Sequence, residues 1–291
     1  MTADLGGRVA LITGAARGIG AATARLLVAR GVRVALVGLE PDRLAALATE
    51  LGTSALWAAA DVTDQQALEA AVATTLAQFG RIDIVIANAG ISTRGNVEVT
   101  DVNAMARVID VNLTGVLRTV KATLPHVVTS RGYVLIVSSA AAFSALPGMA
   151  PYAASKAGVE HFANVLRLEL LPHGVGVGCA HMTWIDTDLV RDVHGDPSAF
   201  RRTLSRLPGA FGRVTPLDAC ARAFADACAT RPRRVFVPRS VGVASFLRTV
   251  MNSALVQRFV GARLAAVARE EAALQQAQGK AFTGSRVGLD P

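Results

Sequence analysis

A tyrosine and a lysine stand four positions apart in the stretch YAASKAGVEHF, residues 152–162, which otherwise contains many small residues. In a helix, side chains at i and i+4 lie on the same face, so Tyr152 and Lys156 would project together. A free phenol titrates at about 10, and a neighbouring ammonium lowers that pKa because it stabilises phenolate. The spacing therefore predicts a proton-transfer pair, although a surface helix could carry the same two residues by chance.

The bulk composition indicates a globular protein with a large core. The chain has 291 residues, of which 52% are hydrophobic, and none of its apolar runs reaches the length of about 18 residues that a membrane span needs. Its N-terminus, MTADLGGRVALITG, lacks the charged start of a signal peptide. We therefore expect a cytoplasmic protein. Cys179, Cys220 and Cys228 have neither a pairing pattern nor zinc-site spacing, so we expect reduced packing residues and no metal.

The formal charge of +8 is concentrated near the C-terminus, where residues 231–291 contain 10 Lys and Arg against 3 Asp and Glu. A nucleic-acid-binding protein would show a basic face supported by aromatic residues or a known motif, and the sequence shows neither. We therefore expect no nucleic-acid partner.

Short β-branched segments alternate with Ala- and Leu-rich segments along most of the chain. Strands are expected at residues 8–13, 33–38, 55–60, 82–88, 133–139, 174–180 and 233–238. This alternation predicts a doubly wound α/β fold, in which about seven parallel strands are covered by helices on both faces. We expect a single domain over residues 1–240, with a mobile helical excursion at 188–211, followed by a basic helical extension over 241–291.

A glycine-rich turn, TGAARGIG at residues 13–20, follows the first expected strand and opens a helix. Gly14, Gly18 and Gly20 would let backbone amides and the helix N-terminus approach a pyrophosphate. The spacing differs from the G-x-G-x-x-G fingerprint, so a tight turn that only packs helix against sheet is the alternative.

Polar residues follow three further strands. Asp61 follows the third strand and is placed either to meet an adenine edge or to cap the next helix. Asn88 to Gly90 follow the fourth strand, and Ser139 follows the fifth, 13 residues before Tyr152. Because parallel strands end at one edge of the sheet, these residues could converge on a single crevice.

Six short motifs resemble, in their order along residues 5–238, those of the classical short-chain dehydrogenase/reductase family. They are TGAARGIG, DV at 61–62, NAG at 88–90, VN at 111–112, VSS at 137–139 and YAASK at 152–156. The resemblance implies a single-domain Rossmann fold, a nicotinamide dinucleotide and reversible reduction of a carbonyl or oxidation of an alcohol. It also implies a homo-oligomer, commonly a dimer or tetramer.

The resemblance also implies roles for individual residues. Tyr152 is the general acid in reduction, Lys156 lowers its pKa and binds the nicotinamide ribose, Ser139 polarises the substrate oxygen and Asn112 binds a water in the proton relay. Besides Tyr152 and Lys156, the residues expected to contact the dinucleotide are Gly14, Arg17, Gly18, Ile19, Gly20, Asp61, Val62, Asn88, Ala89, Gly90, Ile185 and Thr187.

The sequence departs from the family pattern after the sixth strand, where Met182 and Thr183 replace the usual Pro-Gly. This change suggests a reshaped pocket, and it leaves open a dinucleotide-binding regulator with little turnover. The expected pocket walls are mostly apolar, which favours a hydrophobic ketone or secondary alcohol as substrate. They are Ser139, Phe143, Met149, Trp184, Leu189 and Val190, with His194 nearby on the excursion.

The choice between NAD and NADP depends on the end of the second strand. Gly38 stands where NAD-dependent members commonly carry Asp, Leu39 is no phosphate ligand, and Glu40 comes two positions later. Arg17 could meet a 2′-phosphate. The sequence therefore slightly favours NADP(H) over NAD(H).

The C-terminal extension has a mixed helical pattern. Arg248, Arg258, Arg263 and Arg269 share one arc of a helical projection, and Phe246, Val250, Val260 and Leu264 lie opposite. Apolar residues also fall among the arginines, so membrane-surface binding is disfavoured. We expect the apolar arc to pack on the 188–211 excursion of its own or a neighbouring subunit and to narrow the pocket mouth.

Overall fold

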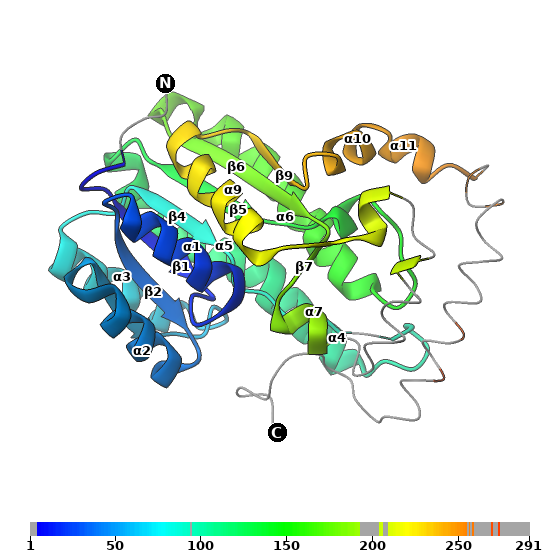
Figure 1. The fold of residues 1–291 in the computed structure, drawn as a ribbon, viewed down its shortest axis with the longest axis horizontal. Helices are drawn as coiled ribbons and strands as arrows, with labels where there is room; N and C mark the ends of the chain where they lie inside the picture. Colours follow the sequence, from blue (N-terminus) through cyan, green and yellow to red (C-terminus); the bar gives the residue numbers. More distant parts are fainter. Residues whose placement is uncertain are drawn as a thin grey trace.

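Seven parallel strands form the central sheet of the computed structural model, which describes residues 5–93, 95–192, 204–205, 209–254, 256, 258, 269 and 273. The strand order is β3-β2-β1-β4-β5-β6-β9 (Figure 1). The bounds are β1 (Val9–Thr13), β2 (Arg33–Gly38), β3 (Ala55–Ala59), β4 (Ile84–Ala87), β5 (Tyr133–Val137), β6 (Gly176–Met182) and β9 (Arg234–Val237). Each strand predicted from the sequence is present, and the doubly wound α/β fold is confirmed.

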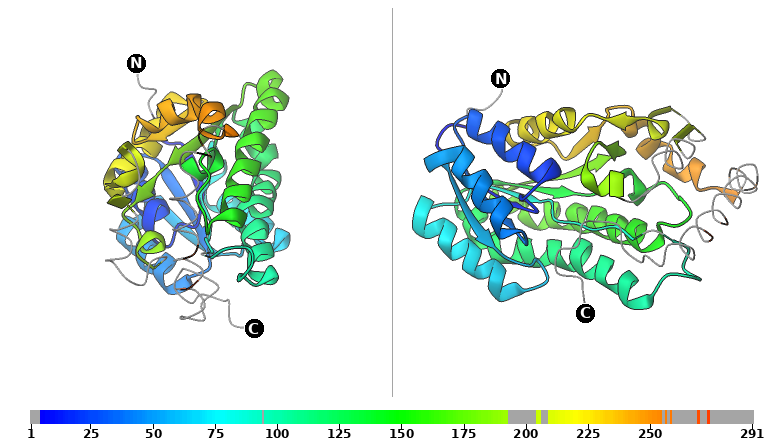
Figure 2. Two further views of the ribbon diagram at one scale, coloured as in Figure 1. Left: turned by 90° about the vertical axis from the view of Figure 1, so that its right-hand side faces the viewer. Right: turned by 60° about the horizontal axis from the view of Figure 1, so that its bottom comes forward.

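Helices cover both faces of the sheet (Figure 2). One layer consists of α1 (Gly18–Ala29), α2 (Pro41–Leu51) and α9 (Leu217–Thr230), whose buried side chains share a core with the sheet. The other consists of α3 (Gln65–Phe79), α5 (Gly115–Thr129) and α6 (Ala150–Leu170), and α4 (Val102–Ile109) packs against α6. Because both faces are covered, β1 and β5 are buried along their whole length, which explains their continuous apolar sequences.

The strand order reverses between β1 and β4, so a crevice lies outside the carboxyl ends of these two strands. The side chain of Thr13, at the end of β1, fixes the chain that leaves β4. Its Oγ1 accepts hydrogen bonds from the backbone N–H groups of Asn88, at 3.1 Å, and Ala89, at 3.2 Å. The Asn88 Nδ2 donates in return to the carbonyl of Thr13 at 3.0 Å. The glycine-rich turn and the NAG segment are thereby held side by side.

A second, two-stranded sheet pairs the segments on either side of the excursion. In this sheet β7 (Trp184–Ile185) pairs in parallel with β8 (Val214–Thr215), and α7 (Asp188–Asp192) opens the segment between them. The sequence analysis did not predict this pair, because two residues are too few to show a strand pattern. Residues 193–203 and 206–208 of the excursion, His194 among them, lie outside the described residues.

The C-terminal extension begins with two short helices, α10 (Val241–Phe246) and α11 (Arg248–Met251), which are separated at Leu247. Phe246 and Val250 are 87% and 59% exposed, so they are not buried against the excursion of the same chain, and packing on a neighbouring subunit stays a prediction. The fully buried Val241 instead packs with Ala140 and Phe143. Val260, Arg263 and Leu264 lie outside the described residues.

Within the described part of the chain, no helix has both the length and the apolarity to cross a bilayer. The described His, Cys, Asp and Glu side chains form no group that could hold a metal ion. Cys179, Cys220 and Cys228 are buried and free, and burial raises the pKa of each thiol to about 12. These thiols therefore remain protonated and serve as packing residues.

Candidate active site

The catalytic residues expected from the sequence come from two adjacent elements. Tyr152 and Lys156 lie one turn apart on α6, whose first turn contains Pro151. Ser139 follows β5 and caps a short 3-10 turn at Ala140–Ala142, accepting a hydrogen bond from the backbone N–H of Ala141 at 3.2 Å. Ser139 and Tyr152 line the same cavity, and Ser139 is near enough to act on the pKa of the phenol. The structure thus brings the predicted acid and the predicted oxygen-binding hydroxyl together at one cavity.

The environment of Tyr152 keeps its phenol protonated at neutral pH. Burial raises the pKa of Tyr152, and Ser139 only partly opposes this effect. The expected lowering by Lys156 is not found. The Lys156 Nζ donates to the carbonyl of Val137 at 2.9 Å and lies 5.6 Å from the centroid of the Tyr152 ring.

Lys156 is itself strongly affected by its surroundings. Its side chain is almost entirely buried, and burial lowers its pKa from 10.5 to about 8. Desolvation disfavours the ammonium form, and the hydrogen-bonded Val137 carbonyl provides only a partial replacement for water. Near neutral pH the lysine is therefore close to its titration range, as acid-base sites often require.

Asn112 holds the loop after β4 to the catalytic helix. It lies in a π-helical turn, Asp110–Thr114, that joins α4 to α5. Its Oδ1 accepts from the backbone N–H of Ile91 at 2.8 Å, and its Nδ2 donates to the Ile91 carbonyl at 2.8 Å and to Ser155 Oγ at 3.2 Å. Both amide protons are engaged, so the side chain could bind a relay water only as an acceptor.

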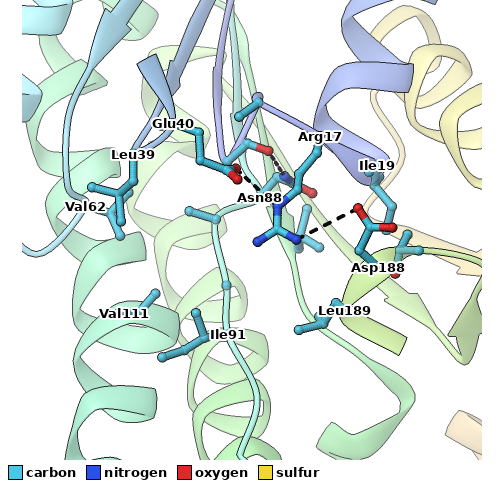
Figure 3. A pocket seen from close by; sticks show the side chains of 18 of the residues that line it. Arg17, Ile19, Leu39, Glu40, Val62, Asn88, Ile91, Val111, Asp188 and Leu189 are labelled. Atoms are coloured by element: carbon cyan, nitrogen blue, oxygen red, sulfur yellow. Dashed lines mark hydrogen bonds and ion pairs between the residues drawn. The ribbon is translucent and has the colours of Figure 1, made fainter. Parts of the chain in front are cut away.

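An open cavity of about 250 Å³ lies in the crevice (Figure 3). Apart from Gly20 and Ile185, which pack behind it, every residue that the sequence analysis assigned to the dinucleotide lines this cavity. They are Gly14, Arg17, Gly18, Ile19, Asp61, Val62, Asn88, Ala89, Gly90, Tyr152, Lys156 and Thr187.

Two glycines of the glycine-rich turn are required by close packing of the backbone. Gly14 has φ +65°, and a Cβ there would lie 2.8 Å from the Cα of Ala89. A Cβ on Gly20 would collide with the carbonyl of Gly14. The turn thus holds the start of α1 at the cavity, which Gly14 and Gly18 line, and the N–H groups and dipole of a helix N-terminus favour a pyrophosphate.

At one end of the cavity, Asp61 is held by two hydrogen bonds. Its Oδ1 accepts from the backbone N–H of Thr63 at 2.8 Å, and its Oδ2 accepts from Arg107 Nη2 at 2.8 Å. Burial alone would raise the pKa of Asp61, but these hydrogen bonds outweigh it and keep the pKa below its usual value. The sequence analysis missed Arg107, because α4 carries none of the motifs that identified the other residues.

Beside the end of β2, Arg17 is engaged by two carboxylates. Its Nε lies 3.1 Å from Glu40 Oε2, and its Nη1 lies 3.9 Å from Asp188 Oδ2 (Figure 3). Glu40 and Asp188 both line the cavity, together with Gly38 and Leu39. The guanidinium that the sequence analysis considered for a 2′-phosphate is thus already paired with acidic groups.

A second cavity, of about 70 Å³, adjoins the first, and Tyr152, Met182 and Leu189 line both. The predicted wall residues Ser139, Met149, Trp184, Leu189 and Val190 line it. Phe143 does not line it, but is buried behind it against Ala140 and Val241. Met182 and Thr183, which the sequence analysis expected to reshape the pocket, also line it. Sequence reasoning missed the other lining residues, which come from three separate segments: Ser92, Ala140, Ala141, Ser144, Leu146 and Phe211.

Comparison with known proteins agrees with this geometry. The family model for the short chain dehydrogenases matches residues 8–197. This chain belongs to the short-chain dehydrogenase/reductase family. Its members use NAD(P)(H), and the chain is an oxidoreductase of the alcohol dehydrogenase type.

Two curated relatives act on alcohols, as their names state. The trans-4-hydroxycyclohexanecarboxylate dehydrogenase of Sinomonas cyclohexanicum is 36% identical over 191 residues, which are 62% of this chain and 74% of the relative. The (-)-trans-carveol dehydrogenase of Rhodococcus erythropolis is 37% identical over 205 residues, or 64% and 74% of the two chains. The crystal structure of gox2181 has a TM-score of 0.75 and 26% identity, covering 82% of this chain and 97% of that one.

Proposed function

We propose that this enzyme transfers a hydride between NAD(H) and a cyclic, apolar secondary alcohol or its ketone, with Tyr152 as the general acid and base. The observation that carries the proposal is the position of Tyr152, which lines both cavities and shares the smaller one with Ser139. The residues of the larger cavity fit a nicotinamide dinucleotide, which when bound supplies or accepts the hydride.

The chain's own groups provide the proton chemistry. In reduction, Tyr152 gives its phenolic proton to the carbonyl oxygen, and Ser139 Oγ donates a hydrogen bond to the same oxygen. The Ser139 hydroxyl can make this bond at low cost, because its present bond to the carbonyl of Met182 is long, at 3.4 Å. Lys156 also lines the larger cavity, where its ammonium would bind the nicotinamide ribose and hold the dinucleotide beside Tyr152. Alcohol oxidation follows the reverse sequence.

The walls of the smaller cavity favour an apolar ring. Leu146, Met149, Trp184 and Val190 supply hydrophobic surface, and the described lining residues include no Lys, Arg or His that could pair with a carboxylate. Both relatives reported above are named for alcohols on six-membered rings, one with a carboxylate and one without. We therefore place this enzyme's substrate with the uncharged ring alcohols.

A spectrophotometric panel tests this assignment. We expect turnover of apolar substituted cyclohexanols, with kcat/KM at least about 10-fold higher than for the corresponding cyclohexanecarboxylates, since burying an unpaired carboxylate costs more than about 1.4 kcal/mol. Calorimetric binding of NAD without turnover of any panel member would support the regulator alternative instead.

The cytoplasmic location and the oligomeric state, a dimer or tetramer, stay predictions. Sedimentation measures the oligomeric state.

The preference for NAD rests on Glu40. The sequence-based preference for NADP required Arg17 to be available, whereas Arg17 is paired with Glu40 and approached by Asp188. We infer that the Glu40 carboxylate accepts from ribose hydroxyls and disfavours a 2′-phosphate.

Glu40→Gln should therefore lower the ratio of kcat/KM for NAD to that for NADP by about 10- to 100-fold, equivalent to about 1.4–2.7 kcal/mol. Steady-state kinetics with both dinucleotides measure this ratio. The matched control is Glu50→Gln, because Glu50 of α2 forms an exposed ion pair with Arg25 of α1. A wild-type enzyme that prefers NADP, or an unchanged ratio in Glu40→Gln, would contradict the inference.

A further inference from the structure

A buried carboxylate shares the catalytic face of α6. Glu160 lies one turn after Lys156 and two turns after Tyr152, so the three side chains project from the same side of the helix. Glu160 is 4% exposed. A buried carboxylate requires a partner, because desolvating an unpaired charge costs several kcal/mol.

The partner of Glu160 comes from the C-terminal extension. Arg248 Nη1, at the start of α11, lies 2.9 Å from Glu160 Oε1. The other basic groups are farther away, with His181 Nε2 at 3.7 Å and Arg234 Nη2 at 4.0 Å. Among the described residues, Arg248 is thus the cation that hydrogen-bonds Glu160 directly, across 88 positions of sequence.

The same extension also contacts the segment that follows Ser139. Asn252 Nδ2 donates to the carbonyl of Phe143 at 3.2 Å, and Val241 is buried with Ala140 and Phe143. The ring of Phe143 lies 5.6 Å from that of His181, whose neighbour Met182 accepts the hydrogen bond of Ser139. The extension therefore contacts both the helix that carries Tyr152 and the turn that carries Ser139.

Polar contacts are central to this attachment. Val241 is the buried apolar anchor of α10, but Val243, Phe246 and Val250 are 63%, 87% and 59% exposed, so most of the larger apolar side chains of the two helices contribute little to it. The ion pair and the Asn252 hydrogen bond are therefore well placed to determine where the extension sits.

We propose that Arg248 is a positioning residue: by binding Glu160 while Asn252 holds Phe143, the C-terminal extension fixes the Ser139 turn against the Tyr152 helix. Displacements of about 1 Å between catalytic groups can cost about 100-fold in rate, so a link between these two elements bears directly on catalysis. The inference rests on the proposed function, in which Ser139 and Tyr152 bind one substrate oxygen.

The test compares Arg248→Met with Arg239→Met, an exposed arginine just before α10. Arg248→Met should lower kcat about 10-fold or more, leave the dissociation constant for NAD within about 2-fold, and increase the primary deuterium isotope effect on kcat, because hydride transfer becomes slower. Arg248→Lys should restore part of the rate. Combining Arg248→Met with Glu160→Gln should cost little more than Glu160→Gln alone, because the two residues act as a pair. Arg239→Met should change none of these quantities.

Hydrogen exchange separates this inference from the proposed function, since it requires no turnover. In Arg248→Met, amides of residues 139–143 should exchange about 10-fold faster or more, while those of the glycine-rich turn are unchanged. A merely structural role would lower Tm but leave kcat, measured well below Tm, and the isotope effect unchanged. That result, or unchanged exchange at residues 139–143, would overturn the proposal. Lack of turnover by the wild type would count against the proposed function alone.

Discussion

Replacing Tyr152 by phenylalanine should lower kcat by about 10²- to 10⁴-fold, the range that general acid-base catalysis supplies. The hydroxyl is the only group removed, and it is the proton donor placed where the two cavities meet. The dissociation constant for NAD should change by less than about 3-fold, because most of the dinucleotide cavity is formed by other residues. Stopped-flow and steady-state kinetics with a ring alcohol give kcat, and calorimetry gives the dissociation constant.

The chain contains only one other tyrosine, which provides a matched control. Tyr133 is buried in β5, and its hydroxyl donates to the carbonyl of Pro232 at 2.9 Å. Tyr133→Phe should cost about 1 kcal/mol of the free energy of unfolding, as expected for one lost hydrogen bond, and should leave kcat unchanged. Retention of wild-type kcat by Tyr152→Phe would remove Tyr152 from the mechanism.

Prediction from the sequence succeeded where the pattern and the fold agree. The strands are read easily because a sheet covered on both faces requires continuous apolar runs, as in VALIT of β1 and YVLIV of β5. The motif residues converge because the ends of parallel strands share one edge of the sheet, which places Gly14, Asn88 and Lys156 around one cavity. Local spacing together with topology was therefore sufficient to predict which residues gather around this cavity.

The features that the sequence did not show depend on tertiary contacts. The pairing of Arg17 with Glu40, 23 positions away, is the contact on which our proposal of NAD instead of NADP rests. The burial of Tyr152 reverses the expected direction of its pKa shift. The ion pair of Glu160 and Arg248 joins the extension to α6, whereas the helical pattern of the extension indicated attachment through its apolar arc. Each of these outcomes depends on contacts between residues that are far apart in the sequence, and spacing along the chain carries no information about such contacts.

Replacing Lys156 by methionine should abolish most activity and at the same time stabilise the fold near neutral pH. The ammonium is buried, and burial lowers its pKa from 10.5 to about 8. Such a shift means that keeping the charge in the folded state costs about 3 kcal/mol at pH 7, at about 1.36 kcal/mol for each pH unit. Methionine removes this cost but also the hydrogen bond to Val137, worth about 1 kcal/mol. The net gain in the free energy of unfolding at pH 7 should be about 2 kcal/mol, whereas kcat should fall about 10²-fold or more.

The pH dependence of this gain follows from proton binding. Below pH 8 both the folded and the unfolded wild type hold the lysine proton, so the full cost is present. Between pH 8 and 10.5 the folded form loses the proton while the unfolded form keeps it, and the wild type therefore becomes more stable relative to Lys156→Met as pH rises. Urea unfolding at pH 7, 9 and 10.5 should show the advantage of Lys156→Met shrinking across this window.

The exposed Lys121 is the control. Lys121→Met should leave activity unchanged and should change the free energy of unfolding by no more than about 0.5 kcal/mol. Two results would show that Lys156 is not a costly buried charge: a Lys156→Met protein that is less stable than the wild type at pH 7, or a stability advantage that grows with pH. A surface lysine titrates at too high a pH to make the difference in the free energy of unfolding shrink between pH 7 and 10.5.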